Sequence, residues 1–244
     1  VERLQATPEL TGEIEEVPPE GSLMPDTYRF ARNTPRSDII ARMQAAQDEF
    51  LEKVWPTRDP DLPIESKEEA LILASIVEKE PGLADERSKV AGVFINRLRQ
   101  GMRLQSDPTI IYGLVGGRAS LGRPIYRSEI LKETPYNTYV IRGLPPTPIA
   151  NPGRAAIEAV LRPAETDALY FVADGTGGHA FAKTLAEHNR NVAEWRKIEA
   201  QMRAEQEAAE REAEGSGGIA AMAEEAVPAS AAQLPVPLPV RAPR

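Results

Sequence analysis

Apolar residues recur every three or four positions along several stretches of the chain, a spacing that places them on one face of a helix. After Pro35, an apolar stripe running from Ile39 to Val54 predicts a helix that ends before Pro56. A second helix is predicted from Ser66 to Glu80, because serine followed three residues later by glutamate forms a capping box. Both helices carry enough apolar residues to contribute to a shared core.

The same pattern continues through the rest of the chain and is interrupted once by a strand signal. Further helices are predicted at 85–100, from 107 onward, near 128–132, at 151–161 and at 184–214. Gly101 is placed to close the first of these helices, and Asp107 to cap the next one, with Pro108 at its first helical position. The stretch "ALYFVADGTGGHAFAKT" predicts a hairpin, with a strand at 168–173, a glycine turn and a partner strand through Phe181. These elements predict an α+β fold, mostly helical with a small antiparallel sheet.

Proline, glycine and the chain start suggest how the chain is divided. Five prolines within residues 1–35 leave room only for short strands or turns, so we expect a lead-in segment there. Residues 36–214 are expected to form one domain, and 215–244, which have few large apolar side chains, a disordered tail. Because the sequence starts at Val1 in a helix-like stretch, we expect it to be a piece of a longer protein.

Charge and composition exclude several classes of partner. The formal net charge is -8, so the protein has no positive field to gather phosphate backbones, and nucleic acid is not an expected partner. There is no cysteine, and His179 and His188 are the two histidines, too few for most metal sites. We therefore expect no metal and no cofactor. No apolar run approaches the roughly 18 residues that span a bilayer, so the chain itself is expected to be soluble.

The end of the second helix, "LILASIVEKEPG", carries two acids after an apolar run. With successive residues about 100° apart around the helix, Glu80 falls on the centre of the apolar stripe and Glu78 on the opposite side, beside Leu71 and Ala74. Burial at the stripe and the negative end of the helix dipole both favour a protonated Glu80. A carboxyl that is neutral near pH 7 is what a general acid for glycosidic cleavage requires. The alternative from periodicity alone is a solvated last turn with no function.

Five blocks of the sequence together are similar to one known family. The blocks are "EGSLMPDTYRF", "ILASIVEKE", "VAGVFINRLRQGMRLQSDPTIIYGL", "TPYNTYVIRGLPPTPIANPG" and "LYFVADGTGGHAFAKTLAEHNRNV", which occur in consistent order over about residues 20–195. They resemble the endolytic murein transglycosylases, or YceG-like family. The resemblance implies a lyase that cuts peptidoglycan strands between N-acetylmuramic acid and N-acetylglucosamine and leaves a 1,6-anhydro end. It places the catalytic glutamate at Glu80, followed by Pro81 where the family usually has threonine or serine.

Two loops and one upstream segment supply candidate substrate-binding residues, since an oxocarbenium-like transition state needs polar groups in a water-poor cleft. Alternatives remain open, with helix capping for Gln105 and Asp107, core packing for the "YNTY" block and a structural turn for the upstream segment. Glu78 is the second choice for the acid. The candidates besides Glu80 are Glu78, Gln105, Asp107, Tyr136, Asn137, Thr138, Tyr139, Glu20 and Tyr28.

Two rival functions remain compatible with the sequence. A muramidase could use the same acid with water in place of the sugar's 6-hydroxyl, and a catalytically silent module could bind glycan as a scaffold.

The spacing of Gly175, Gly177 and Gly178 suits a hairpin turn better than a phosphate loop, and His179 is expected to be an ordinary strand residue.

The resemblance also implies surroundings for the parent protein. These are an amino-terminal membrane anchor and a LysM-like subdomain outside this chain, a site on the periplasmic side of a bacterial inner membrane, peptidoglycan strands as substrate and peptidoglycan synthases as partners.

Overall fold

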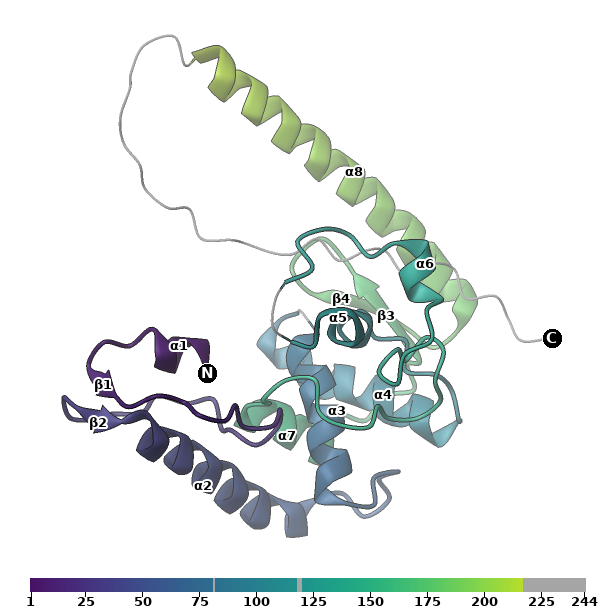
Figure 1. The fold of residues 1–244 in the computed structure, drawn as a ribbon. Helices are drawn as coiled ribbons and strands as arrows, with labels where there is room; N and C mark the ends of the chain where they lie inside the picture. Colours follow the sequence, from purple (N-terminus) through teal and green to yellow (C-terminus); the bar gives the residue numbers. More distant parts are fainter. Residues whose placement is uncertain (81, 118–119, 217–244) are drawn as a thin grey trace.

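Helix α3, Lys67–Lys79, lies in the centre of the main core of the computed structural model, which describes residues 1–80, 82–117 and 120–216 (Figure 1). Most of its residues from Ala70 to Val77 are buried, because neighbouring elements cover it on several sides. Its beginning follows the predicted capping box only in part. The Ser66 hydroxyl accepts the Glu69 N–H at 3.2 Å, but the Glu69 carboxylate accepts the N–H of Glu65 instead of that of Ser66.

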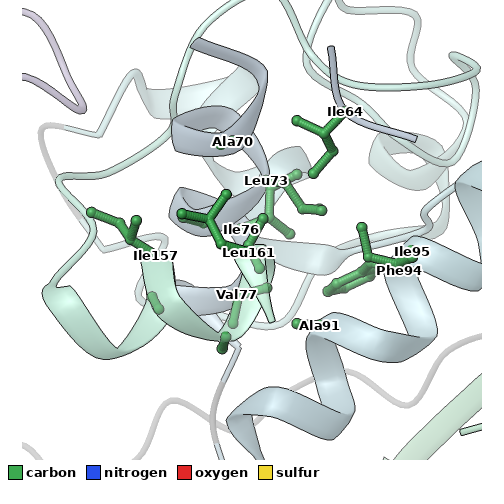
Figure 2. Close-up of a cluster of buried hydrophobic side chains, with 14 of the residues drawn as sticks. Ile64, Ala70, Leu73, Ile76, Val77, Ala91, Phe94, Ile95, Ile157 and Leu161 are labelled. Atoms are coloured by element: carbon green, nitrogen blue, oxygen red, sulfur yellow. The ribbon is translucent and has the colours of Figure 1, made fainter. Parts of the chain in front are cut away.

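Two helices pack against α3 and complete the core. These are α4, Arg87–Arg99, which follows the 3₁₀ turn η2, Ala84–Glu86, and α7, Arg154–Leu161. Figure 2 shows Phe94 and Ile95 of α4 and Ile157 and Leu161 of α7 directed toward the apolar side chains of α3. Burying such aliphatic and aromatic side chains supplies most of the stabilising free energy of a core like this one.

The predicted start of α7 at Asn151 is wrong. The helix begins at Arg154 with Gly153 as its N-cap. Asn151 instead joins two other segments, since its side-chain oxygen accepts the Leu23 N–H at 3.0 Å and its amide donates to Glu20 Oε2 at 3.0 Å. An asparagine before a proline resembles a cap in sequence, and only the tertiary contact shows its actual partners.

The first 35 residues form short elements, as the prolines predicted. Helix α1, Glu2–Gln5, is followed by β1, Leu10–Thr11, which pairs in parallel with β2, Thr34–Pro35. Helix α2, Arg36–Val54, comes next and is extended by the 3₁₀ turn η1, Trp55–Thr57. The guanidinium of Arg36 donates hydrogen bonds to five carbonyls of the first segment, those of Leu4, Gln5, Thr7, Leu10 and Gly12.

The predicted hairpin and the α+β class are confirmed. Strands β3, Tyr170–Ala173, and β4, His179–Ala182, are antiparallel, with Phe171 opposite Phe181. The hairpin contacts α4 on one side, and the long helix α8, Leu185–Ser216, contacts both strands before it extends away from the domain (Figure 1). Of the predicted tail, Gly215 and Ser216 belong to α8, and 217–244 lie outside the described residues. No helix in the described ranges is long and apolar enough to cross a membrane.

Helix α5, Asp107–Val115, brings its amino end to the carboxyl end of α3. Asp107 is not the cap that the sequence predicted. Ser106 occupies the N-cap position, and no side chain there caps the helix. The short helix α6, Arg127–Ile130, packs on α5 through a second apolar cluster of Ile110, Ile125 and Ile130. The junction between α3 and α5 is therefore where the polar candidates gather.

Candidate active site

Glu80 leaves helix α3 at its carboxyl end and lies partly buried at the junction with α5. Its backbone N–H still donates to the Ile76 carbonyl at 3.1 Å, but its φ of -74° and ψ of 122° are extended. A residue that precedes proline disfavours helical geometry, so the sequence itself stops the helix there. The Ser106 hydroxyl donates to Glu80 Oε1 at 2.6 Å, and Ser106 is only 2% exposed.

Two threonines hold Ser106 in place. The Ser106 N–H donates to Thr138 Oγ1 at 2.9 Å, and the Thr109 hydroxyl donates to the Ser106 carbonyl at 2.6 Å. The two threonine hydroxyls are 2.8 Å apart, and both residues are fully buried. Gln105, with a positive φ of 55°, donates its N–H to the Thr138 carbonyl at 3.2 Å. The loop that presents Ser106 to Glu80 is thus fixed by the "YNTY" segment.

Asp107 and Tyr139 form a second acidic group beside Glu80. The Tyr139 hydroxyl donates to Asp107 Oδ1 at 2.5 Å. Burial raises the pKa of Asp107 to about 6, although the bond from Tyr139 opposes this rise. Burial also raises the pKa of Tyr139 well above its ordinary value, so its hydroxyl stays a proton donor at neutral pH.

Arg97 supplies a buried positive charge behind these acids. Its guanidinium donates to the carbonyls of Leu169, Arg103 and Leu104, and to Gln105 Oε1 at 3.1 Å. Burial lowers its pKa, and an arginine with a lowered pKa is still charged at neutral pH. It joins α4, the loop before α5 and the start of the hairpin behind the site.

The electrostatics of the site favour a neutral Glu80. Desolvation raises the pKa of Glu80 to about 7, and the nearby Asp107 adds to the rise. The hydrogen bond from Ser106 and the charge of Arg97 act in the opposite direction, and desolvation outweighs both. A carboxyl with this pKa can both give and take a proton near neutral pH, which is the property a general acid–base group needs.

A small recess opens beside Glu80, on the side of η2 and the start of α4. It is lined by Val77, Glu80, Gly82, Leu83, Glu86, Arg87 and Val90. In this recess, Glu86 Oε2 lies 2.9 Å from His179 Nδ1 of the hairpin. Glu80 thus lines the recess, and Ser106 contacts its carboxyl.

The structure brings only some of the predicted residues to Glu80. Asp107 and Tyr139 lie close enough to Glu80 to interact with its charge, whereas the side-chain oxygen of Gln105 is bound by Arg97. Thr138 lies just behind Ser106, and Asn137 is 1% exposed, with its side-chain amide donating to the carbonyls of Glu129, Ile130 and Lys132. The polar groups of Asn137 and Thr138 are thus used inside the protein, where they shape the loop.

The other candidates form separate contacts. Tyr136 packs edge-on against Tyr112, with ring centroids 4.7 Å apart, and its hydroxyl is 2.8 Å from Thr147 Oγ1. Glu78 Oε2 accepts the Gly153 N–H at 3.1 Å, at the amino end of α7. Tyr28 donates to the Met24 carbonyl at 2.9 Å. Glu20 is held by Asn151 and contributes to the raised pKa of Tyr112, whose larger cause is burial.

Ser106 and Arg97 are not among the site residues that the sequence predicts. Ser106 was visible only as a polar residue between two candidates, and Arg97 looked like an ordinary basic residue in the last turn of a helix. Its position in register with the apolar residues Val90, Val93 and Phe94 was the available signal that it is buried. Among the described residues, no group of three or more histidines and carboxylates could hold a metal ion.

The fold and the site define a helical α+β domain that presents a partly buried, protonatable carboxyl at the end of its central helix. The chain belongs to the YceG-like family, whose sequence profile matches residues 2–194. It is 40% identical over 174 residues to a Bacillus subtilis (strain 168) protein named endolytic murein transglycosylase, an alignment covering 71% of this chain and 47% of that protein. A protein of the same name from Streptococcus pneumoniae serotype 2 (strain D39 / NCTC 7466) is 38% identical over 179 residues, 72% of this chain and 32% of its own length.

A solved structure agrees with the fold. The crystal structure of a yceG-like protein from Listeria monocytogenes superposes with a TM-score of 0.59 at 39% sequence identity, covering 70% of this chain and 54% of that one. The chain thus spans about half the length of the Bacillus subtilis relative and about a third of the pneumococcal one. The family assignment from the five sequence blocks is confirmed.

Proposed function

We propose that this chain carries the catalytic domain of an endolytic peptidoglycan lytic transglycosylase, with Glu80 as its acid and base. The observation that carries the proposal is a single carboxyl whose pKa is raised to about 7 by burial, bonded to Ser106 and next to a recess. Family membership and the names of the relatives support the same reaction.

In the first step, protonated Glu80 donates its proton to the oxygen that links N-acetylmuramic acid to N-acetylglucosamine. The bond between that oxygen and the anomeric carbon breaks, and positive charge develops on the sugar ring. The ionised Glu80 then accepts the proton of the sugar's own 6-hydroxyl, whose oxygen bonds to the anomeric carbon. Because the attacking group belongs to the same sugar, the step is intramolecular and consumes no water.

The neighbours of Glu80 have distinct tasks in this proposal. Ser106 orients the carboxyl, and its bond to the ionised form limits how far the pKa rises. Asp107, held by Tyr139, places a second acidic group near the developing positive charge of the sugar. Gln105, Tyr136, Glu20, Tyr28 and Glu78 stay candidates for more distant sugar contacts, while Asn137 and Thr138 act by fixing the loop.

The surroundings of the full-length parent remain part of the proposal. Following the family, we propose that the parent acts on peptidoglycan strands from the periplasmic side of a bacterial inner membrane, held by an amino-terminal anchor and working with peptidoglycan synthases. Residues 36–214 are the proposed catalytic domain and 1–35 its lead-in.

Digestion of purified sacculi by wild type and by the Glu80→Gln variant tests the function. The variant keeps the shape of the side chain and the Ser106 contact but cannot donate an acidic proton. We expect wild type to release anhydro-ended muropeptides and the variant to release none, with Glu78→Gln as the matched control that loses less. Mass spectrometry separates the outcomes, since a muramidase product is heavier by one water. Binding to sacculi with no soluble product would indicate a scaffold instead.

A further inference from the structure

Glu86 and His179 form a part-buried hydrogen-bonded pair beside the recess, although they are far apart in sequence. His179 Nδ1 is 2.9 Å from Glu86 Oε2, and the His179 backbone N–H donates to Glu86 Oε1 at 3.1 Å. The side chains are 5% and 20% exposed, respectively. Both oxygens of Glu86 are therefore bound by a single residue of the hairpin, which holds the start of α4 against strand β4.

The hairpin is shaped to receive this carboxylate. A Cβ atom at Gly178 would lie 2.8 Å from Glu86 Oε1, so a larger residue there would displace the carboxylate from its present position, and Gly177 has a φ of 92°. The His179 ring packs edge-on against Phe171 and Phe181, with centroids 5.1 Å and 6.0 Å away. The imidazole is thus fixed on its apolar sides as well as by its polar contact.

The same imidazole touches the chain just after Glu80. A Cβ atom at Gly82 would lie 2.5 Å from His179 Cε1, which means that the ring rests directly on the backbone of Gly82. Gly82 and Glu86 both line the recess together with Glu80. The pair thus supports one wall of the recess two residues away from the proposed acid.

We propose that His179 and Glu86 are positioning residues that fix the backbone at Gly82 and form the wall of the recess that limits water access to the Glu80 carboxyl. The inference rests on the proposed role of Glu80 and adds two residues to it. Neither is expected to touch the reacting atoms.

The physical argument concerns placement and solvation. Displacing a catalytic group by about 1 Å costs on the order of a hundredfold in rate. The charged and titratable groups that face Glu80 are Asp107 and Tyr139, Arg97 of α4, and Glu86 and Arg87 in the recess. If the wall opens, water reaches the carboxyl and the pKa of Glu80 falls from about 7 toward its ordinary value.

The test uses three variants at position 179. Asparagine can place an amide N–H where Nδ1 lies and so keep the contact with Glu86, whereas glutamine extends past it and alanine removes it. We expect His179→Ala to lower kcat roughly 10- to 100-fold on soluble glycan strands, with a smaller change in KM. His179→Asn is expected to recover more of kcat than His179→Gln. In the alanine variant, the alkaline limb of the pH–rate profile moves to lower pH.

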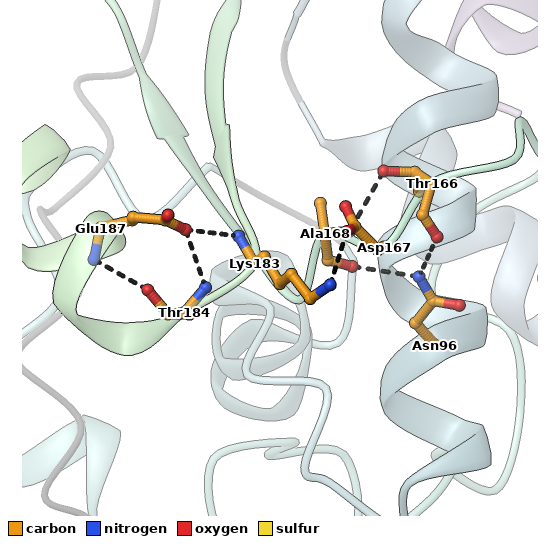
Figure 3. A network of polar contacts seen from close by, with 7 residues as sticks. All are labelled: Asn96, Thr166, Asp167, Ala168, Lys183, Thr184 and Glu187. Atoms are coloured by element: carbon orange, nitrogen blue, oxygen red, sulfur yellow. Dashed lines mark hydrogen bonds and ion pairs between the residues drawn. The ribbon is translucent and has the colours of Figure 1, made fainter.

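Two controls on the same hairpin separate positioning from general stability. Lys183→Ala breaks the exposed ion pair with Asp167, 2.8 Å long, which Figure 3 shows at the other end of β4. Val172→Ala removes buried methyl groups from β3 and lowers the melting temperature without touching Glu86. Both controls should keep the wild-type pH–rate profile.

The outcomes are distinguishable. If the alanine, asparagine and glutamine variants lose stability but keep the wild-type kcat and pH–rate profile, the pair is a structural contact only and the inference is overturned. If the alanine variant does not fold, the comparison of asparagine with glutamine decides in the same way. An active Glu80→Gln variant would instead contradict the proposed function, independently of the results for the variants at position 179.

Discussion

Replacing Glu80 with glutamine is predicted to stabilise the folded protein at alkaline pH while abolishing activity. The folded-state pKa is about 7, against 4.5 for a free glutamate, so the folded state keeps a proton that the unfolded state releases. Wild-type stability should therefore fall as the pH rises from about 4.5 to about 7, because ionising the buried carboxyl becomes a cost of folding. Glutamine is uncharged throughout and avoids this cost.

The size of the effect follows from the difference in pKa. A difference of about 2.5 at 1.36 kcal/mol for each pKa step gives about 3 kcal/mol, and some entry of water reduces it to about 2–3 kcal/mol. For a domain of this size, that corresponds to roughly 5–10 °C in melting temperature. Nearly all of the difference should be present at pH 8 and nearly none at pH 4.

Urea denaturation of wild type and variant between pH 4 and pH 8.5 measures the difference directly. Other titrating groups are common to both proteins and cancel to a first approximation. Glu78→Gln is the control. It should gain nothing at pH 8, because its carboxylate accepts the Gly153 N–H at the amino end of α7 and an amide accepts it less strongly. A free-energy difference between Glu80→Gln and wild type that stays constant across the pH range would refute the buried, neutral carboxyl.

Three further predictions concern the surroundings of the acid. Ser106→Ala removes a bond that lowers the pKa of Glu80, so the pKa should rise above about 7 and the alkaline limb of the pH–rate profile should move upward. Asn137→Ala removes the side-chain donor of the Ile130 and Lys132 carbonyls and should cost roughly 2–4 kcal/mol in urea denaturation, while the Glu129 carbonyl keeps the Lys132 N–H. Gly178→Ala pushes a methyl group against Glu86 and should lower the melting temperature and kcat together, by roughly 1–3 kcal/mol in stability. A variant with wild-type values in its assay would contradict the corresponding contact.

Local sequence signals predicted most of the helices and the hairpin. The serine cap at Ser66 and the glycine at Gly101, which has a φ of 63°, act through neighbouring backbone groups, so the sequence alone reveals them. The helical spacing also placed Glu80 on the apolar side of its helix. The predictions of helix caps are wrong where a side chain bonds to a residue distant in sequence instead of to the nearby helix end. Asp107 binds Tyr139 instead of capping its helix, and Asn151 binds Leu23 and Glu20.

The site residues that the sequence missed share the same cause. The roles of Arg97 and His179 depend on contacts 72 and 93 positions away, and no pattern within a helix or strand encodes such a contact. His179 fits the alternation of a strand, so the pattern predicts an ordinary strand residue. The glycine pair before His179 is a local sign that another group packs closely against the turn.

The cluster of five carbonyls around Arg36 has a practical consequence for anyone shortening this chain. A version that begins at residue 13 would delete every one of those acceptors at once and expose a guanidinium that now ties α2 to α1 and β1. A shortened chain should therefore retain Leu4 and the residues after it. If it does not, Arg36 should be replaced with a smaller residue so that no unpaired guanidinium remains at the amino end of α2.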